Sequence, residues 1–222
     1  MELVPFYVSL IFIVLTIVSL YQFYQATHKN KGALTLILAI ALLQAVLSQQ
    51  DFYLASEAIP PRILFLILPS LILILIGFFT EKGKRLIAHL DLEKYTYLHT
   101  VRIGVEVVLF WLYLGTLVPE SMTFAGRNFD VLSGITAPLI AYFGIRKGKL
   151  SKSFQLWWNV VCLLLVLQVV VTGILSAPSV LQQVAFDQPN VGVLYFPFCW
   201  LPSIVVPLVI FGHLVSIKRL SR

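Results

Sequence analysis

The sequence predicts an all-α protein: a polytopic membrane helical bundle with seven transmembrane helices. Of its 222 residues, 59% are hydrophobic and 12% are charged, whereas a soluble domain has about 25% charged residues. Seven apolar runs are close to the roughly 20 residues that cross a hydrocarbon core, and basic residues gather between them. We therefore expect one seven-helix transmembrane domain over residues 1–222, with the N-terminus outside and the C-terminus in the cytoplasm.

Each predicted span is an apolar run with aromatic or polar residues near its ends, as at a membrane interface. The second and fifth runs are the shortest. The spans are 4–25, 32–49, 63–80, 97–118, 131–145, 154–175 and 195–217. Before the fourth span, residues 81–95 predict an amphipathic cytoplasmic helix with Leu86, Ile87, Leu90 and Leu92 on its apolar side.

The direction of the chain follows from its basic residues. Thirteen of the sixteen lysines and arginines flank alternate loops on one side, and only Arg62 and Arg127 fall on the other. By the positive-inside rule, the side with thirteen is cytoplasmic. The net charge of +6 is thus a topology signal and not a nucleic-acid footprint. Short loops and the lack of glycosylation acceptors favour a multi-pass protein of a bacterial inner membrane. The thirteen are Lys29, Lys31, Lys82, Lys84, Arg85, Lys94, Arg146, Lys147, Lys149, Lys152, Lys218, Arg219 and Arg222.

The fourth span carries charge inside an apolar run. His99, Arg102, Glu106 and Tyr113 are spaced by three, four and seven residues, so an α-helix places them on one face. A charge at the bilayer centre costs at least about 2.5 to 3.5 kcal/mol, so it usually faces a protein interior or a wet cavity. This face is the strongest functional signal in the sequence. The alternative is a structural ion pair of Arg102 with Glu106, four residues apart, that fixes helix packing.

These charges favour a small secondary transporter or permease-like protein that moves a small molecule or ion. Glu106 would be a proton- or cation-coupled carboxylate and Arg102 a substrate anchor. The centre would also include Gln44, Gln168 and Tyr142. Polar groups within spans otherwise serve as hydrogen-bonded helix contacts, and that alternative stays open.

An outer gate is predicted before the fifth span, where Arg127 would pair with Glu120 or Asp130. The simpler interpretation is that Asn128 or Asp130 caps the fifth helix, where acidic charge suits the positive end of the helix dipole.

Two functional alternatives use other features. His89, His99 and His213 lie near the predicted cytoplasmic side and are candidates for a metal site, which would suit an intramembrane lipid-modifying metalloenzyme. No motif of a hydrolase or nucleotide-driven pump is present, so the sequence leans away from an enzyme, and it identifies no cofactor. Cys162 and Cys199 are expected to be buried free thiols. The third possibility is a non-catalytic subunit of a larger membrane complex. Beyond the bilayer, the expected partners are therefore another membrane protein or a second copy of the chain.

Two pairs of similar short motifs suggest an internal repeat. ALLQAVLS around Gln44 and LVLQVVVTG around Gln168 are each followed by an LPS motif, at Pro69 and Pro202. Residues 4–80 would then match 131–217, with 97–118 as the linker helix. This 3+1+3 parallel arrangement resembles the layout of small sugar transporters of the SWEET type. The resemblance is one of layout, and it would imply a substrate site between the halves.

Overall fold

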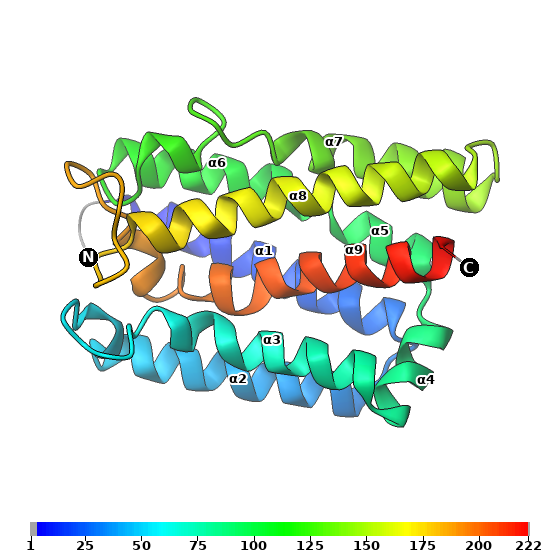
Figure 1. Ribbon diagram of the computed structural model, residues 1–222, viewed down its shortest axis with the longest axis horizontal. Coiled ribbons are helices and arrows are strands. Elements are labelled where there is room, and N and C mark those ends of the chain that lie inside the picture. The colour runs from blue at the N-terminus through cyan, green and yellow to red at the C-terminus, as the bar shows by residue number, and fades with distance from the viewer. Residues whose placement is uncertain (1–3, 222) are drawn as a thin grey trace.

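The computed structural model describes residues 4–221, and within them the chain forms helices and no strands. Helix makes up 72% of the structure, so the all-α prediction is confirmed. The long helices run along the longest axis of the molecule, and the described ends of the chain lie at opposite ends of this axis (Figure 1). The helices are α1 Phe6–Ala26, α2 Lys31–Gln49, α3 Leu64–Phe79, α4 Glu81–His89, α5 Leu92–Leu98, α6 Val101–Leu114, α7 Val131–Leu139, α8 Lys152–Ser176 and α9 Val206–Leu220.

Five helical segments are long and apolar enough to cross a membrane: α1, α2, the combined α5 and α6, α8, and α9 with the π-helical turn Leu201–Val205 before it. A sixth is added if α3 and α4, bent by 85° at their junction, count as one span. The predicted fifth span corresponds to α7 and the π-helical stretch Ile140–Arg146, which together are shorter. The count of seven spans therefore stays a prediction, as does their orientation.

The predicted amphipathic helix over 81–95 is wrong as a single helix. The first of two helices, α4, ends at His89. A second helix, α5, then begins after Asp91, whose side chain accepts a hydrogen bond from the Lys94 N–H at 3.1 Å. A capping carboxylate competes with helix continuation because it binds backbone N–H groups that would begin a new helix. Burial raises the pKa of Asp91, but its contacts with Lys94 outweigh burial and lower that pKa. The remaining α4 buries Ile87 and exposes its basic residues.

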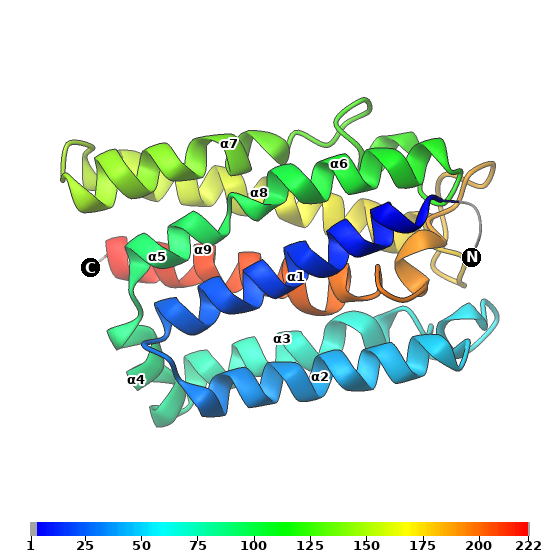
Figure 2. The ribbon, with the colours of Figure 1, turned by 180° about the vertical axis from the view of Figure 1, so that it is seen from behind.

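The predicted fourth span is broken between α5 and α6, at His99 and Thr100. Around the break, the Arg102 N–H donates to the His99 carbonyl at 3.1 Å and the Ile103 N–H to the Thr100 carbonyl at 3.2 Å. Both hydrogen bonds join residues three positions apart, as in a 3₁₀-helix, and so make the turn tighter than in an α-helix. The break, which Figure 2 shows between α5 and α6, places Arg102 in the first turn of α6.

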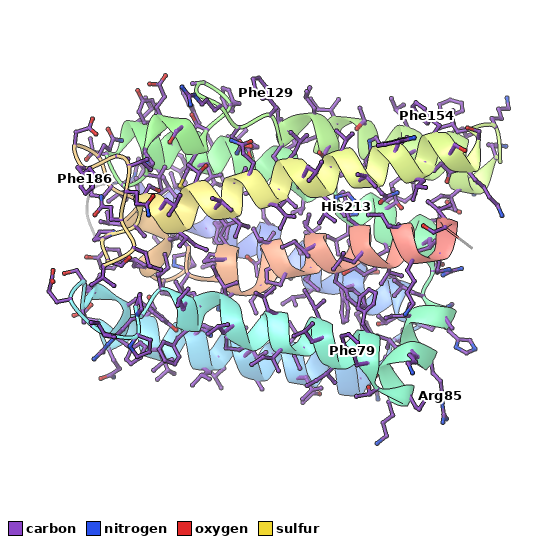
Figure 3. All side chains as sticks on the ribbon, viewed as in Figure 1. Phe79, Arg85, Phe129, Phe154, Phe186 and His213 are labelled. Carbon is purple, nitrogen blue, oxygen red and sulfur yellow. The ribbon has the colours of Figure 1, made fainter. Side chains whose placement is uncertain are left out.

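The α6–α7 connection reaches back along the bundle. In Figure 1, α7 begins near the middle of the molecule, whereas the C-terminal end of α8 reaches much further toward the left end of the bundle. The loop before α7 makes up this difference. Phe129, 56% exposed, points away from the bundle on this loop (Figure 3), and its neighbours Asn128 and Asp130 are buried.

Helix α9 is the most buried of the long helices and packs against α8, α5 and α3. Helix α1 packs against α5 and α6. Helices α2 and α3 lie together along one side of the bundle in both ribbon views (Figures 1 and 2). The proline-interrupted segments include the two π-helical turns, near Pro138 and Pro202.

Candidate functional site

A buried group of polar side chains surrounds Arg102, and we call it the arginine cluster. The break between α5 and α6, helices α6, α8 and α9, and the loop before α7 all contribute to it. Every member is at most 6% exposed to solvent. The cluster consists of His99, Arg102, Glu106, Asn128, Asp130, Asn159 and His213.

Arg102 forms an ion pair with Asp130. The guanidinium Nε donates to Asp130 Oδ2 at 2.6 Å, and Nη2 contacts Oδ1. This two-pronged geometry matches the fork of the guanidinium to the two carboxylate oxygens. Because both side chains are buried, each charge depends on the other for the interactions it has lost with water.

The remaining donors of Arg102 reach two other helices. Nη2 donates to the Cys162 carbonyl at 3.3 Å, and Nη1 lies 2.9 Å from His213 Nε2. A guanidinium only donates, so Nε2 accepts. His213 Nδ1 then carries the hydrogen and donates to Asn159 Oδ1 at 2.9 Å. Arg102 therefore fixes His213 as one neutral tautomer.

His99 stacks on His213, with ring centroids 4.0 Å apart and planes 13° apart. The edge of Trp158 packs against both rings, at 6.0 and 5.5 Å between centroids. A Cβ at Gly212 would lie 3.1 Å from His99 Nε2 and would overlap the Tyr95 ring, so the close approach of α5 to α9 requires glycine there. His99 Nδ1 is buried without a hydrogen-bond partner among residues 4–221.

Glu106 lies one turn along α6 from Arg102 and binds the same loop. Asn128 Nδ2 donates to Glu106 Oε1 at 2.5 Å and to the Met122 carbonyl at 3.0 Å. Asn128 Oδ1 accepts from the Asp130 N–H at 2.9 Å. Glu106 Oε2 is buried and has no hydrogen-bond partner within the described chain. Arg102 and Glu106 therefore hold the loop before α7 through two of its side chains, Asp130 and Asn128.

These contacts correct three expectations. Arg102 pairs with Asp130, 28 residues away, and not with Glu106. Asp130 occupies the N-cap position of α7, but its side chain makes no capping hydrogen bond because it binds the guanidinium. Arg127 and Glu120 are exposed, and neither forms an ion pair in the part of the chain that is described, so the predicted outer gate is not assembled.

The two predicted glutamines lie outside the cluster. Gln44 is buried, donates to the Phe65 carbonyl at 2.9 Å and accepts from the Tyr53 hydroxyl, which is the role of a helix-to-helix contact. Gln168 is exposed and donates to the Arg127 carbonyl at 3.2 Å. The two residues on which the similar motifs are centred thus have unlike surroundings, and the repeat itself stays a prediction.

Tyr142 and His89 also lie elsewhere. The Tyr142 ring is 37% exposed and sits beside the charged groups of Arg146 and Lys147, at 5.9 and 5.5 Å from its centroid. His89 is exposed on α4, where its Nδ1 is 2.9 Å from the Arg85 carbonyl. Neither side chain hydrogen-bonds to Arg102, whose partners within residues 4–221 are Asp130, His213 and the Cys162 carbonyl.

The predicted metal site is not assembled as three histidines. Only His99 and His213 lie together, and both ring nitrogens of His213 already have protein partners. Over residues 4–221, no group of three or more histidine, cysteine, aspartate or glutamate side chains could hold a metal ion. Cys162 and Cys199 are buried free thiols in the structure, as expected.

Sequence reasoning missed the connection of Asn128 and Asn159 to the charged face of α6. Both asparagines were visible as polar residues near or inside apolar runs. Their partners, however, lie 22 and 54 residues away, at Glu106 and His213. Helical periodicity relates only positions a few residues apart, so it does not reveal these pairs.

The fold and this site define an all-helical protein with several apolar helices and a buried, arginine-centred polar cluster. Residues 59–221 match a family described as a domain of unknown function, DUF8737. The chain belongs to this family, and the match contains the whole arginine cluster. No curated protein and no solved structure matches the sequence.

Proposed function

We propose that this protein is a multi-pass membrane protein of a bacterial inner membrane, with its N-terminus outside and its C-terminus in the cytoplasm. Its apolar helices support this placement, since many of their large side chains are exposed on the outside of the bundle. A bilayer would cover such a surface, whereas a soluble monomer rarely exposes large contiguous apolar patches. The basic turns before α2 and α8 lie at the same end of the molecule as the C-terminus (Figure 1).

Within the membrane, the function that the geometry supports best is a small secondary transporter or permease-like protein whose Glu106 binds a proton. One observation carries this proposal: Glu106 Oε2 is buried without a hydrogen-bond partner among the described residues, while Oε1 accepts from Asn128. An unpaired buried carboxylate oxygen is costly, and a proton on Oε2 would remove the charge. Glu106 can therefore exist either as a charged carboxylate or as a neutral carboxylic acid in the same protein environment.

In this proposal, the arginine cluster is the closed state of the carrier. Two contacts hold the loop before α7 against α6, namely the Arg102–Asp130 ion pair and the Asn128–Glu106 hydrogen bond. Protonation of Glu106 weakens the second contact, because a neutral acceptor binds an N–H less strongly than a charged one. A small anion could then replace the Asp130 carboxylate on Arg102. Arg102 and Glu106 line neither of two apolar cavities of about 710 and 130 Å³ in the bundle, in agreement with a closed state.

Replacing Glu106 with glutamine tests this function. Purified protein would be reconstituted into liposomes containing a pH-sensitive dye, and small sugars, amino acids and carboxylates would be added in turn. We expect the natural protein to move protons with one of these compounds and Glu106→Gln to lose the pH dependence of flux. Glu120→Gln removes an exposed carboxylate and serves as the control. Full pH dependence of flux in Glu106→Gln would contradict the role of Glu106.

A second candidate is the non-catalytic subunit of a membrane complex, which the close packing of the cluster favours. All members of the cluster are buried, and such a network can serve solely to fix helix positions. This candidate predicts a partner protein that co-purifies in fixed ratio from mild detergent, and no flux in liposomes. The metalloenzyme alternative gains no such support, since His213 has no free ring nitrogen.

A further inference from the structure

An apolar cavity of about 710 Å³ lies between α2, α3, α4 and α9, on the side of the bundle away from the arginine cluster. Its size falls within the range of about 300 to 1,000 Å³ that is usual for small-molecule sites. Two of its wall residues, Leu36 and Ile76, are 56% and 47% exposed, so the cavity opens sideways onto the surface of the bundle. Its walls also include Phe23, Ile37, Ile74, Leu208 and Phe211.

The polar residues of the cavity are concentrated at one end, apart from Ser70 in its interior. Asn30, at the start of α2, and Thr80 and Lys82, at the α3–α4 junction, lie at the basic end of the bundle. From Ser70 to Thr80 the wall is ten residues of helix, or about 15 Å. The cavity is thus an elongated apolar slot with a polar mouth.

Helix α4 closes the basic end of this slot because the chain bends by 85° after α3. Thr80 holds the bend, since its Oγ1 accepts from the Gly83 N–H at 3.1 Å. A Cβ at Gly83 would overlap the backbone of Gly77, so the two helices meet through their glycines. An amphipathic helix with this orientation suits the plane of a membrane surface.

The charge at the mouth differs between two lysines of α4. Lys84 binds Glu81 at 2.8 Å, so its charge is partly neutralised within the helix. Lys82 lines the cavity and has no ion-pair partner among the described residues. An anion at the mouth would therefore meet an uncompensated positive charge beside an apolar slot.

We propose that this cavity binds an anionic phospholipid, with one acyl chain in the slot and its phosphate at Lys82. The apolar walls and the sideways opening suit the acyl chain of such a lipid. The basic mouth suits its phosphate, because basic residues at a membrane surface attract anionic lipid. This inference rests on the membrane placement in the proposed function. It is independent of proton binding by Glu106 and of transport.

The test uses purified full-length protein in detergent with two added lipids of identical chains, phosphatidylglycerol and phosphatidylcholine. Native mass spectrometry counts bound lipid, and thermal unfolding measures stabilisation. We expect one tightly held phosphatidylglycerol and a rise in Tm that phosphatidylcholine does not match. Lys82→Ala should weaken phosphatidylglycerol binding about fivefold, the usual effect of one basic residue at a membrane surface. Lys84→Ala removes the same charge from the same helix and should leave binding unchanged.

A second pair of variants tests the slot itself. Ala33→Phe adds a ring to a residue that lines the cavity and should abolish binding of the lipid, whereas Leu42→Phe changes an exposed position on the same helix and should not. Equal binding of the two lipids, or equal losses in Lys82→Ala and Lys84→Ala, would overturn the proposal. If Ala33→Phe does not fold, the lysine pair still decides. Failure of the protein to fractionate with membranes would instead refute the proposed placement.

Discussion

Arg102 uses its guanidinium to join three parts of the chain: Asp130 before α7, Cys162 in α8 and His213 in α9. Each partner comes from a different element, so one side chain sets the mutual positions of all three. Buried charges are costly when a partner is lost, because the remaining charge cannot recover its contacts with water. Arg102 and Asp130 should therefore be the most sensitive residues of the bundle.

Removing Asp130 tests this sensitivity. We expect Asp130→Ala to lower the free energy of unfolding by about 3 to 5 kcal/mol, since it leaves Arg102 buried and unpaired. Glu120→Ala removes an exposed carboxylate nearby in sequence and should change stability by less than about 0.5 kcal/mol. Thermal unfolding in detergent measures both. Similar Tm values for the two variants would show that the ion pair contributes little.

Asn128 allows a pH test of the contact with Glu106. In Asn128→Asp, two carboxyl groups would face each other at the position of a 2.5 Å hydrogen bond. At neutral pH their like charges repel, whereas at acid pH one shared proton restores a hydrogen bond. The folded variant then binds more protons than its unfolded chain, so its stability relative to the natural protein should rise as pH falls.

The measurement is the difference in Tm between Asn128→Asp and the natural protein at pH 8 and at pH 5. Asn30→Asp is the control, because it places the same substitution at the exposed N-cap of α2. There a charged carboxylate is a good cap, so acid should slightly reduce its stability. A Tm difference for Asn128→Asp that does not shrink at pH 5 would mean that Glu106 and residue 128 are apart in solution.

At the scale of helices, the α3–α4 bend depends on a glycine contact. Gly83→Ala should lower stability by about 1 to 3 kcal/mol, as overpacked positions do, because its Cβ would overlap the backbone of Gly77. Gly32→Ala, in the first turn of α2, meets nothing closer than 3.5 Å and should stabilise the protein by about 0.4 to 1 kcal/mol. Thermal unfolding of the two variants compares them directly, and equal effects would contradict the close contact.

The positions of the long helices could be predicted from the sequence because hydrophobic runs and end signals are local. Helix α8, for example, begins where Ser151 caps Phe154 at 3.2 Å, close to the predicted start at 154. The break at His99 was not predictable, since no proline or glycine marks it. It accompanies the close stacking of His99 on His213, a contact between residues 114 positions apart.

For the candidate site, too, local spacing is predictable from the sequence, whereas contacts between distant residues are not. That Arg102 and Glu106 are buried on one face of a helix follows from their spacing in an apolar run. Which residues satisfy them depends on how the loop before α7 returns into the bundle, and its side chains carry no local pattern that reveals this. The sequence neighbours of Asp130 therefore predict a helix cap or a gate, whereas its partner in the structure is Arg102.

At the scale of the whole molecule, the sidedness of two loops decides whether α7 crosses the membrane. Glu57 is exposed in the connection between α2 and α3, and Lys149 is exposed in the connection between α7 and α8. These two connections lie at opposite ends of the bundle (Figure 1). Three predicted spans separate them: α3, the combined α5 and α6, and α7 with its π-helical extension. Three crossings place the two residues on opposite sides of a membrane, whereas two crossings would place them on the same side.

Single cysteines at these positions give the measurement. Native Cys162 and Cys199 are 3% and 0% exposed, so a membrane-impermeant maleimide should react only with the introduced thiol. In intact cells we expect labelling of Glu57→Cys but not of Lys149→Cys, which should react only after the membrane is opened. The reverse pattern would invert the proposed orientation. Labelling of both in intact cells would mean that α7, the shortest of the seven apolar segments, does not cross, so that the loop that carries Asp130 and the loop that carries Lys149 would lie on the same, outer side.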